Sequence, residues 1–417
     1  MQTVPNHQSS LTTWLDHLMS IHPTDIDMGL DRVSSVAKSM GLTDLGNTKV
    51  ITVGGTNGKG TTCAMIEQIM TLAGYRVGVY SSPHMLKYNE RVRVAGTNAS
   101  DQALIDAFCA IDQARGQISL TFFEYATLAG LMIFKQSKLD IVLLEVGLGG
   151  RLDATNIIDA DISVVTSIDI DHQEYLGDTR ELVGREKAGI FRSGRPAIVG
   201  DSDLPPSVIE VANDTGAQLS VVGEAFDYTL HGDSWDFNGA SLSLSGLPVP
   251  QLPLPNAATA LAVVELLIPS ISQDVVQQGL LQAKLTGRLE RFSDEPLILL
   301  DVAHNPHAAR YLKQRLGAYS GRRVVALCGM LKDKDYQTVI STLDEVVDTW
   351  YFSDLDCERS ASAERLVACL PQGSIGYPFE SIALAYRALT NNICDGDMVI
   401  VFGSFYTVAE FKNLNLG

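Results

Sequence analysis

A glycine-rich loop at residues 54–62 constrains the fold of this chain more than any other stretch. The loop follows the apolar run at residues 50–53 and precedes a helix-like stretch at residues 63–70. A strand, a glycine turn and a helix in this order let successive backbone N–H groups point at an anion, beside the positive end of the helix. Lys59 directly follows the turn and can reach the outer phosphates. The loop therefore predicts an α/β fold that binds a nucleoside triphosphate.

One residue of the loop departs from the ordinary phosphate-binding motif. That motif has Ser or Thr directly after the lysine as a Mg²⁺ ligand, whereas this chain has Gly60 there. We therefore expect most Mg²⁺ ligands to come from elsewhere in the chain, with Thr61 as a partial substitute. The alternative interpretation is a turn whose glycines serve only packing, but it leaves Lys59 without a role.

The composition is that of a packed globular protein. Its 417 residues, 46% of them hydrophobic, exceed what one hydrophobic core usually supports, so we expect two domains. The formal net charge of −18 argues against nucleic-acid and anionic-membrane partners, because its field repels both. We find no signal-peptide pattern, no membrane-span candidate and no zinc or CxxC spacing among the six cysteines. We therefore expect a cytoplasmic protein and, without any coiled-coil pattern, a monomer.

Apolar runs that alternate with helix-like stretches predict mainly parallel sheets. Four strand candidates lie in the first part of the chain and four in the last, at residues 50–53, 76–80, 140–146, 162–168, 297–301, 324–329, 350–352 and 398–403. Such continuous apolar strands are typical of sheets that helices cover on both faces. We expect a P-loop domain over residues 1–286, with a short N-terminal segment and a small antiparallel flap at about 217–247. A Rossmann-like α/β domain would follow over residues 287–417.

Polar residues follow three of the apolar strands. Ser82, Glu145 and His172 hold these positions, the last of them beside Asp169 and Asp171. Because ligands of parallel sheets bind at the carboxyl ends of the strands, we expect these side chains near the glycine loop. The alternatives are a turn role for Ser82, a solvated strand-end acid for Glu145 and a structural role for His172.

Six stretches spread over both expected domains match one family of ligases; they are residues 55–61, 80–84, 121–125, 144–156, 184–190 and 301–306. Together they resemble the folylpolyglutamate synthase family, in particular its bacterial bifunctional form that is also dihydrofolate synthase, within the Mur ligase superfamily. Gly60 is what this family carries. The resemblance implies a Mur-ligase-type P-loop domain and an ATP-dependent ligase of folate and one-carbon metabolism. Such a ligase adds L-glutamate to dihydropteroate and further glutamates to reduced folates, through an acyl phosphate.

The resemblance also implies how this reaction controls charge. Lys59 and two Mg²⁺ ions would offset the repulsion between the substrate carboxylate and the γ-phosphate. Ser82 and Glu145 would hold one Mg²⁺, and His172 with Glu145 the second. Lys187 would react with CO₂ and act as a metal ligand in the form of a carbamate, because an ammonium group would repel the metals. The alternative is an unmodified ammonium that faces phosphate.

The resemblance assigns the remaining site residues to ATP, dihydropteroate and glutamate. ATP would contact Thr56, Asn57, Gly58, Lys59, Gly60, Thr61, Asn256, Arg288 and Asp301. Dihydropteroate would contact Met28, Gly29, Leu30, Asp31, Thr121, Phe122, Phe123, Glu124, Leu152, Asp153 and Ala154. Aromatic faces suit a flat pterin and carboxylates suit its N–H edge, with ordinary core packing as the alternative for Phe122 and Phe123. Glutamate would bind near His304 and Ser404.

Two rival interpretations concern the class of protein. A peptidoglycan-precursor Mur ligase shares the chemistry but needs an extra N-terminal domain, for which we expect no room before Gly54. A nucleotide-binding regulatory switch would have no use for Lys187, His172 or a second α/β domain. Phosphate release that depends on the acid substrate would separate these classes.

Overall fold

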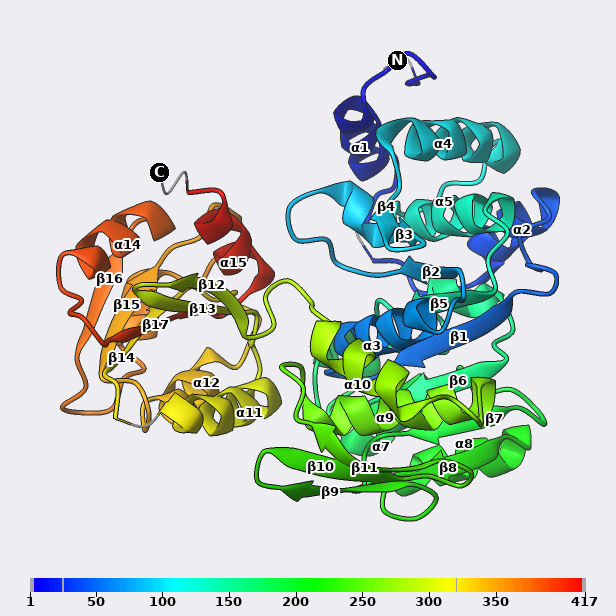
Figure 1. Ribbon diagram of the computed structural model, residues 1–417. Helices are drawn as coiled ribbons and strands as arrows, with labels where there is room; N and C mark the ends of the chain where they lie inside the picture. Colours follow the sequence, from blue (N-terminus) through cyan, green and yellow to red (C-terminus); the bar gives the residue numbers. More distant parts are fainter. Residues whose placement is uncertain (1–3, 25, 320, 415–417) are drawn as a thin grey trace. The chain divides into compact units, whose positions relative to one another are not determined.

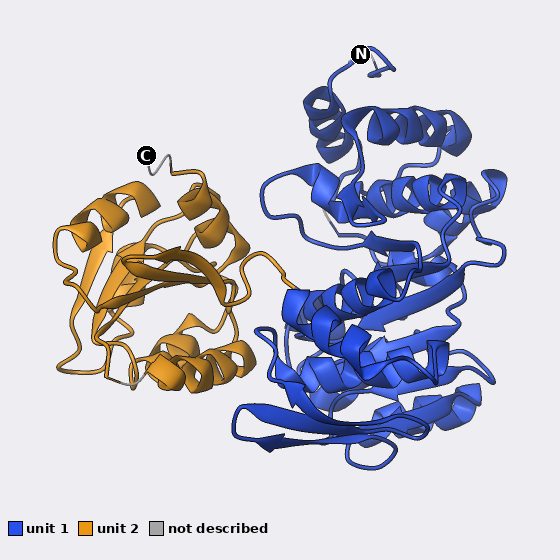
Figure 2. Cartoon of the chain, in the orientation of Figure 1, with its two compact units in different colours: residues 1–283 blue, residues 284–417 orange. Residues whose placement is uncertain are grey.

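The chain forms two compact units, residues 1–283 and 284–417 (Figure 2). The computed structural model describes residues 4–24, 26–319 and 321–414. The division between Ala283 and Lys284 lies close to the boundary expected after residue 286. The first unit contains a hydrophobic cluster around Trp14 and Phe108, and the second unit contains another around Trp350 and Phe402. Each unit therefore has a core of its own.

An eight-stranded sheet forms the centre of the first unit (Figure 1). In sequence order its strands are β1 Lys49–Gly54, β2 Val77–Tyr80, β3 Val92–Val94, β4 Thr97–Asn98, β5 Ile141–Glu145, β6 Ile162–Val165, β7 Pro196–Val199 and β8 Gln218–Val221. They are arranged as β4-β3-β2-β5-β1-β6-β7-β8, and all pairs are parallel except those of β3 and β4. Every residue of β2, β5 and β6 is buried, which explains their continuous apolar sequences. The predicted mainly parallel sheet is confirmed.

Ten helices in the described part of the first unit accompany this sheet. Their bounds are α1 Leu11–Ser20, α2 Asp31–Ser39, α3 Lys59–Leu72, α4 Asp101–Arg115, α5 Phe122–Gln136, α6 Gln173–Leu176, α7 Arg180–Ala188, α8 Pro206–Thr215, α9 Leu254–Leu267 and α10 Gln273–Gln282. The phosphate-loop helix α3 packs against α9 and α10 (Figure 1). No helix in the described ranges is both long enough and apolar enough to cross a membrane.

A three-stranded antiparallel sheet forms the flap of the first unit, with β9 Asp227–His231, β10 Ser234–Asn238 and β11 Ser243–Pro248. In β10 the side chains of Trp235 and Phe237 are buried, and they alternate with less buried neighbours, as expected for a half-buried strand. The flap begins at Asp227 rather than at about 217. The reason is that residues 218–221 form β8, which α8 connects in parallel to β7 in the large sheet.

A six-stranded sheet in the order β12-β13-β17-β14-β15-β16 forms the centre of the second unit. Its elements are β12 Glu290–Asp294, β13 Leu297–Asp301, α11 Pro306–Leu316, β14 Val324–Cys328, α12 Tyr336–Leu343, β15 Thr349–Ser353, α13 Ala363–Val367, β16 Gly376–Phe379, α14 Ile382–Thr390, β17 Met398–Phe402 and α15 Phe405–Lys412. Only the edge pair of β12 and β13 is antiparallel among the described strands. This alternation of strands and helices confirms the predicted Rossmann-like α/β architecture.

Candidate functional site

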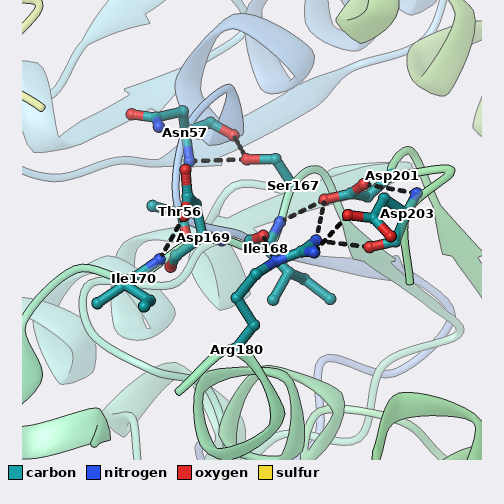
Figure 3. Close-up of polar contacts among 9 residues, drawn as sticks. All are labelled: Thr56, Asn57, Ser167, Ile168, Asp169, Ile170, Arg180, Asp201 and Asp203. Carbon is teal, nitrogen blue, oxygen red and sulfur yellow. Dashed lines mark hydrogen bonds and ion pairs between the residues drawn. The ribbon is translucent and has the colours of Figure 1, made fainter. Parts of the chain in front are cut away.

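The phosphate loop connects β1 to α3 and is hydrogen-bonded to the segment that follows β6. The backbone N–H of Asn57 donates to Ser167 Oγ at 3.0 Å, and that of Thr56 donates to Ser167 O at 2.8 Å (Figure 3). The hydroxyl of Thr56 also donates to Asp169 O at 2.8 Å. These bonds fix the loop relative to the segment that leads to His172.

A group of charged side chains restrains this segment from its other side. Arg180 Nε donates to Ile168 O at 3.0 Å, and its guanidinium group forms ion pairs with Asp201 and Asp203 (Figure 3). Asp201 Oδ2 in turn accepts the backbone N–H of Ile168 at 2.8 Å. Hydrogen bonds to the phosphate loop on one side and to Arg180 and Asp201 on the other therefore hold the backbone just before His172.

Gly58 lets the loop and helix α9 approach each other closely. This glycine caps α3 with a φ of 89°, and a Cβ atom there would lie 2.6 Å from Asn256 Oδ1. The side-chain amide of Asn256 donates to Thr61 Oγ1 at 2.6 Å. Asn256, which the resemblance assigns to the nucleotide set, thus lies directly against the first turn of α3.

The strand order brings three of the expected site residues to one edge of the sheet. The neighbours β2, β5, β1 and β6 pair in parallel. Glu145 therefore ends its strand at the same sheet edge at which Ser82, the phosphate loop and His172 follow theirs. Glu145 is the last residue of β5, is 6% exposed and lies beside Val53 of β1. The common edge agrees with the ligand-binding edge of open α/β sheets.

A small cavity of about 30 Å³ lies beside the phosphate loop. Its polar walls include Thr56, Lys59, Asp171, His172 and Lys187. Lys59 Nζ donates to Gly55 O at 2.9 Å and to Thr56 O at 3.3 Å, so its ammonium group lies over the loop. The cavity therefore gathers two lysines and a histidine where an outer phosphate would lie.

Lys187 is buried in α7, with 4% of its surface exposed. Burial and, to a smaller extent, the charge of Lys59 lower its pKa to about 7, against the opposite effects of Asp171 and Asp153. A substantial fraction of this side chain is therefore a neutral amine near pH 7.

The donor groups at this edge fit a magnesium ion. Mg²⁺ is usually held by one or two carboxylates and keeps several waters, and a buried carboxylate, a hydroxyl and an imidazole are available from Glu145, Ser82 and His172. No group of three or more His, Cys, Asp or Glu side chains in the described residues forms a metal site by itself. An additional oxygen ligand would complete this set, and the unmodified amine of Lys187 does not supply one.

A larger cavity of about 270 Å³ adjoins the small one. Its lining includes eight of the residues expected to contact dihydropteroate, namely Met28, Gly29, Thr121, Phe123, Glu124, Leu152, Asp153 and Ala154. Gly147, Leu148 and His172 line both cavities, and Ser82 lines the larger one. The two cavities therefore share a wall.

Three residues expected in the pterin set do not line this cavity. Leu30 precedes α2 and Asp31 is its exposed first residue. Phe122 packs edge-on against Tyr88, with ring centroids 5.6 Å apart. The side chain of Phe123, by contrast, approaches Gly147 so closely that a Cβ atom there would lie 2.5 Å from its ring. Of the two adjacent phenylalanines, only Phe123 faces the cavity.

Thr121 and Glu124 form the N-terminal capping box of α5. The hydroxyl of Thr121 accepts the Glu124 N–H at 3.1 Å, and Glu124 Oε2 accepts the Thr121 N–H at 2.7 Å. Glu124 Oε1 lies 3.3 Å from a guanidinium nitrogen of Arg32, which also pairs with Asp27 at 2.8 Å. These contacts tie the segment before α2 to the wall of the cavity.

Asp153 holds the loop that follows β5. Its Oδ1 accepts the N–H and hydroxyl of Thr155 at 2.9 and 2.7 Å, and its Oδ2 accepts the N–H groups of Gly147 and Leu148 at 3.0 and 2.8 Å. Burial raises its pKa, and these hydrogen bonds act in the opposite direction. Both carboxylate oxygens thus serve the loop itself.

Sequence reasoning missed Arg91 as a cavity residue. Arg91 ends the short 3₁₀ helix Tyr88–Arg91, lines the larger cavity and donates from Nε to His84 Nδ1 at 2.9 Å. Burial and the Arg91 charge lower the pKa of His84 to about 4, so His84 stays neutral and can accept this bond. A single arginine in a polar stretch gives no periodic signal that could have identified it.

The second unit carries the other expected site residues. Asp301 ends β13 and accepts the N–H groups of Leu289 and Ala303 at 2.9 and 2.8 Å; burial raises its pKa, and the charge of Arg288 opposes this effect. The Arg288 guanidinium lies 5.4 Å from the centre of the Phe405 ring.

His304 and Ser404 follow the neighbouring strands β13 and β17. His304 Nδ1 lies 2.8 Å from Val302 O. The hydroxyl of Ser404 caps α15 by accepting the Thr407 N–H at 3.0 Å. The side chain of Ser404 therefore has a structural partner in its own unit.

Comparisons with known proteins identify the family. The model of the Mur ligase middle domain matches residues 53–237, and that of the Mur ligase glutamate ligase domain matches residues 287–405. The dihydrofolate synthase/folylpolyglutamate synthase of Escherichia coli is 48% identical over 98% of this chain and 96% of its own length.

Solved structures agree with this relationship. Escherichia coli FolC in complex with DHPP and ADP superimposes with a TM-score of 0.95 at 48% identity and covers 98% of each chain. A bifunctional folylpolyglutamate synthase/dihydrofolate synthase with Mn, AMPPNP and L-glutamate bound gives a TM-score of 0.92 at 47% identity, again over 98% of each chain. The chain therefore belongs to the dihydrofolate synthase/folylpolyglutamate synthase family of ATP-dependent, Mur-type ligases.

Proposed function

We propose that this chain joins L-glutamate to dihydropteroate, forming dihydrofolate, and adds further glutamates to reduced folates at the expense of ATP. The shared wall of the two cavities carries this proposal. Gly147, Leu148 and His172 line both the larger cavity and the small cavity at the phosphate loop. A flat heterocycle in the larger cavity would thus direct its carboxylate toward the γ-phosphate.

The chain's own residues reduce the electrostatic barrier to this reaction. The substrate carboxylate and the triphosphate are both anions, so their approach needs positive charge at the point of contact. Lys59 and the backbone N–H groups at the start of α3 supply such charge at the phosphates. The carboxylate then attacks the γ-phosphorus, ADP leaves, and the amine of glutamate displaces phosphate from the acyl phosphate.

Two Mg²⁺ ions would supply further positive charge at the phosphate oxygens. We assign Ser82 and Glu145 to one ion and Glu145 and His172 to the other, which the oxygen and nitrogen donors at this sheet edge support. The remaining anionic ligand is assigned to Lys187 as a carbamate. Its neutral amine adds to CO₂, an N–C bond forms as one C–O π bond opens, one proton is released, and the resulting carbamate places an anion next to Lys59. Burial and the lowered pKa of Lys187 support this assignment.

The other assignments concern the nucleotide and glutamate. Thr56 to Thr61 and Asn256 of the first unit would bind ATP, supported by the contact between Asn256 and α3. Arg288 and Asp301 of the second unit would contribute to nucleotide binding, and His304 and Ser404 to glutamate binding. We further propose a cytoplasmic monomer that binds small anionic substrates and neither nucleic acid nor membranes.

Incubation of the full chain with ATP, Mg²⁺, L-glutamate and dihydropteroate tests the function. We expect phosphate release that requires all four components and a product heavier by one glutamyl residue in mass spectrometry. Lys59→Met should lower the rate by about 10²- to 10³-fold, because it removes a preorganised cation. Lys38→Met, at an exposed position of α2, is the matched control. Phosphate release that is independent of dihydropteroate would contradict the proposal.

A further inference from the structure

Arg91 places a guanidinium group in the wall of the larger cavity. The residue is 8% exposed, and its guanidinium carbon lies 5.6 and 5.4 Å from the ring centres of Tyr88 and Phe122. The bond from its Nε to His84 fixes the orientation of the planar group. Two aromatic rings, one imidazole and the side chain of Tyr80, which is hydrogen-bonded to Arg91, thus hold the guanidinium group at the cavity.

Within the described part of the chain, no carboxylate balances the charge of Arg91. No acidic side chain of the described residues forms an ion pair with Arg91, whereas the nearby Arg93 pairs with Glu67 at 2.7 Å. A buried charge without an ionic partner is costly unless it gains hydrogen bonds or ring contacts. Acceptor atoms of a bound ligand would offset this cost further.

The position of Arg91 shows which end of a substrate it faces. Arg91, Thr121 and Glu124 line the larger cavity and are not among the residues that line the small one. The reacting carboxylate belongs at the shared wall, near His172 and the phosphate loop. Arg91 also packs on Phe122 at the start of α5, next to Thr121 and Glu124, so we infer that it lies at the heterocycle end of a bound substrate.

Glu124 offers the complementary group in the same part of the cavity. Its Oε2 caps α5, whereas Oε1 has no hydrogen-bond partner and only the 3.3 Å ion-pair contact with Arg32. Asp153, the other buried acid of the cavity, uses both oxygens within its own loop. One carboxylate oxygen without a hydrogen-bond partner and one guanidinium group thus line the same cavity.

We propose that Arg91 binds the acceptor edge of the pterin ring, the 4-oxo oxygen and N5, while Glu124 Oε1 accepts from its 2-amino and N3–H donor edge. The inference rests on the function proposed above and adds a specificity-determining residue to it. A guanidinium fork suits two neighbouring acceptors, and a carboxylate suits two neighbouring N–H donors. This pair of groups would fix the ring in one orientation.

Binding of two ligands by the full-length chain tests the inference. The probes are dihydropteroate and 6-hydroxymethyl-7,8-dihydropterin, which has the same ring but no benzoate. Arg91→Met should weaken both by the same factor, about 10- to 100-fold, which is the range for one or two hydrogen bonds to a charged group. Arg91→Lys, which keeps the charge and one donor, should recover part of this loss. Lys87→Met removes an exposed charge from the same loop and should change neither affinity.

Several results would overturn the inference. If Arg91→Met weakens dihydropteroate but leaves the benzoate-free probe unchanged, Arg91 holds the carboxylate end. Unchanged affinity for both probes, with ADP binding and thermal unfolding as in the wild type, would show that Arg91 does not touch the ligand. If Arg91→Met also lowers the affinity for ADP, the two probes are compared in Arg91→Lys instead. An unequal loss of affinity for the two probes in Arg91→Lys would then overturn the inference. A wild-type chain that binds neither probe would instead refute the proposed function itself.

Discussion

The side chains of Lys59 and Lys187 line the same small cavity, but the surroundings of Lys59 favour the charged form and those of Lys187 favour the neutral form. Lys59 donates to two loop carbonyls, which are contacts that favour an ammonium group. Lys187 is buried beside it, and both burial and Lys59 favour its neutral form. The same cavity therefore offers a cation for phosphate and a nucleophilic amine for CO₂.

The carbamate proposed for Lys187 should depend on pH in a defined direction. Because the pKa of Lys187 is about 7, the fraction of neutral amine rises from pH 6 to pH 8. At a fixed partial pressure of ¹³CO₂ we expect the carbamate signal in ¹³C NMR to rise over this range. The signal should be absent from Lys187→Met. A spectrum without any protein carbamate at pH 8 would refute the modification.

The same pKa shift has a consequence for stability. Between pH 7 and the ordinary lysine value of about 10.4, the unfolded chain binds a proton at Lys187 that the folded chain lacks. The contribution of this group to the free energy of unfolding therefore rises with pH in that window. Carbamate formation in the folded chain would add to the effect in the presence of CO₂.

Asp153 should contribute mainly to the stability of its loop. In Asp153→Asn, the amide can keep an oxygen toward Thr155 but presents a donor to the N–H groups of Gly147 and Leu148. Leaving buried donors without an acceptor costs about 1–3 kcal/mol each. We expect a free energy of unfolding lower by about 2 kcal/mol or more in denaturant titration. Asp16→Asn, at an exposed position of α1, is the control. An equal decrease of the free energy of unfolding in both variants would contradict this role of Asp153.

Single residues mark the limit of what the sequence could predict. The position of Ser82, Glu145 and His172 at one edge of the sheet was predictable, because parallel strands bring their carboxyl ends together. The different directions of the Phe122 and Phe123 side chains could not be predicted, because the two residues are identical and adjacent in the sequence. The engagement of both Asp153 oxygens depends on how one loop folds back on itself, for which the sequence gives no periodic signal.

At the scale of elements, the phosphate loop depends on the contact between α3 and α9. Gly58→Ala should place a methyl group 2.6 Å from Asn256 Oδ1 at a φ of 89°. Backbone strain of about 1–2 kcal/mol and displacement of Asn256 should both follow. We expect ADP affinity to fall at least tenfold in calorimetric titration.

Gly74 provides a matched control for this experiment. It lies just after α3 with a φ of 93°, and a Cβ atom there would meet nothing within 4 Å. Gly74→Ala therefore introduces similar backbone strain without a collision. If both variants lost the same ADP affinity, the contact with Asn256 would have no role in nucleotide binding.

Elements were predictable where the sequence period was unambiguous. The continuous apolar runs of β1, β5 and β6 became buried parallel strands, as expected. The segment at residues 218–221 has a mixed pattern at the edge of the sheet, so it was assigned to the flap instead of to β8. Edge strands bury less of their surface, and their sequences consequently carry a weaker signal.

At the scale of the whole molecule, the net negative charge acts on substrates at long range, whereas the cationic side chains act inside the cavities. The net charge of −18 repels anionic substrates at long range, whereas the positive charges of Lys59 and Arg91 are confined to two cavities. Screening by salt weakens the long-range repulsion more than the contacts inside a cavity. The chain can thus bind anions locally despite its acidic composition.

The two units should fold independently, because each contains at least one large hydrophobic cluster built from its own residues. Separate chains of residues 1–283 and 284–417 both exceed the size at which a single core is marginal. We expect each to unfold cooperatively in denaturant, with an m value that scales with its length. Residues 1–283 should still bind 6-hydroxymethyl-7,8-dihydropterin, because the whole larger cavity lies in this unit, but should not ligate glutamate. If the fragment of residues 1–283 unfolds without a cooperative transition, its core needs the second unit. If this fragment alone ligates glutamate, the second unit is not required for the reaction.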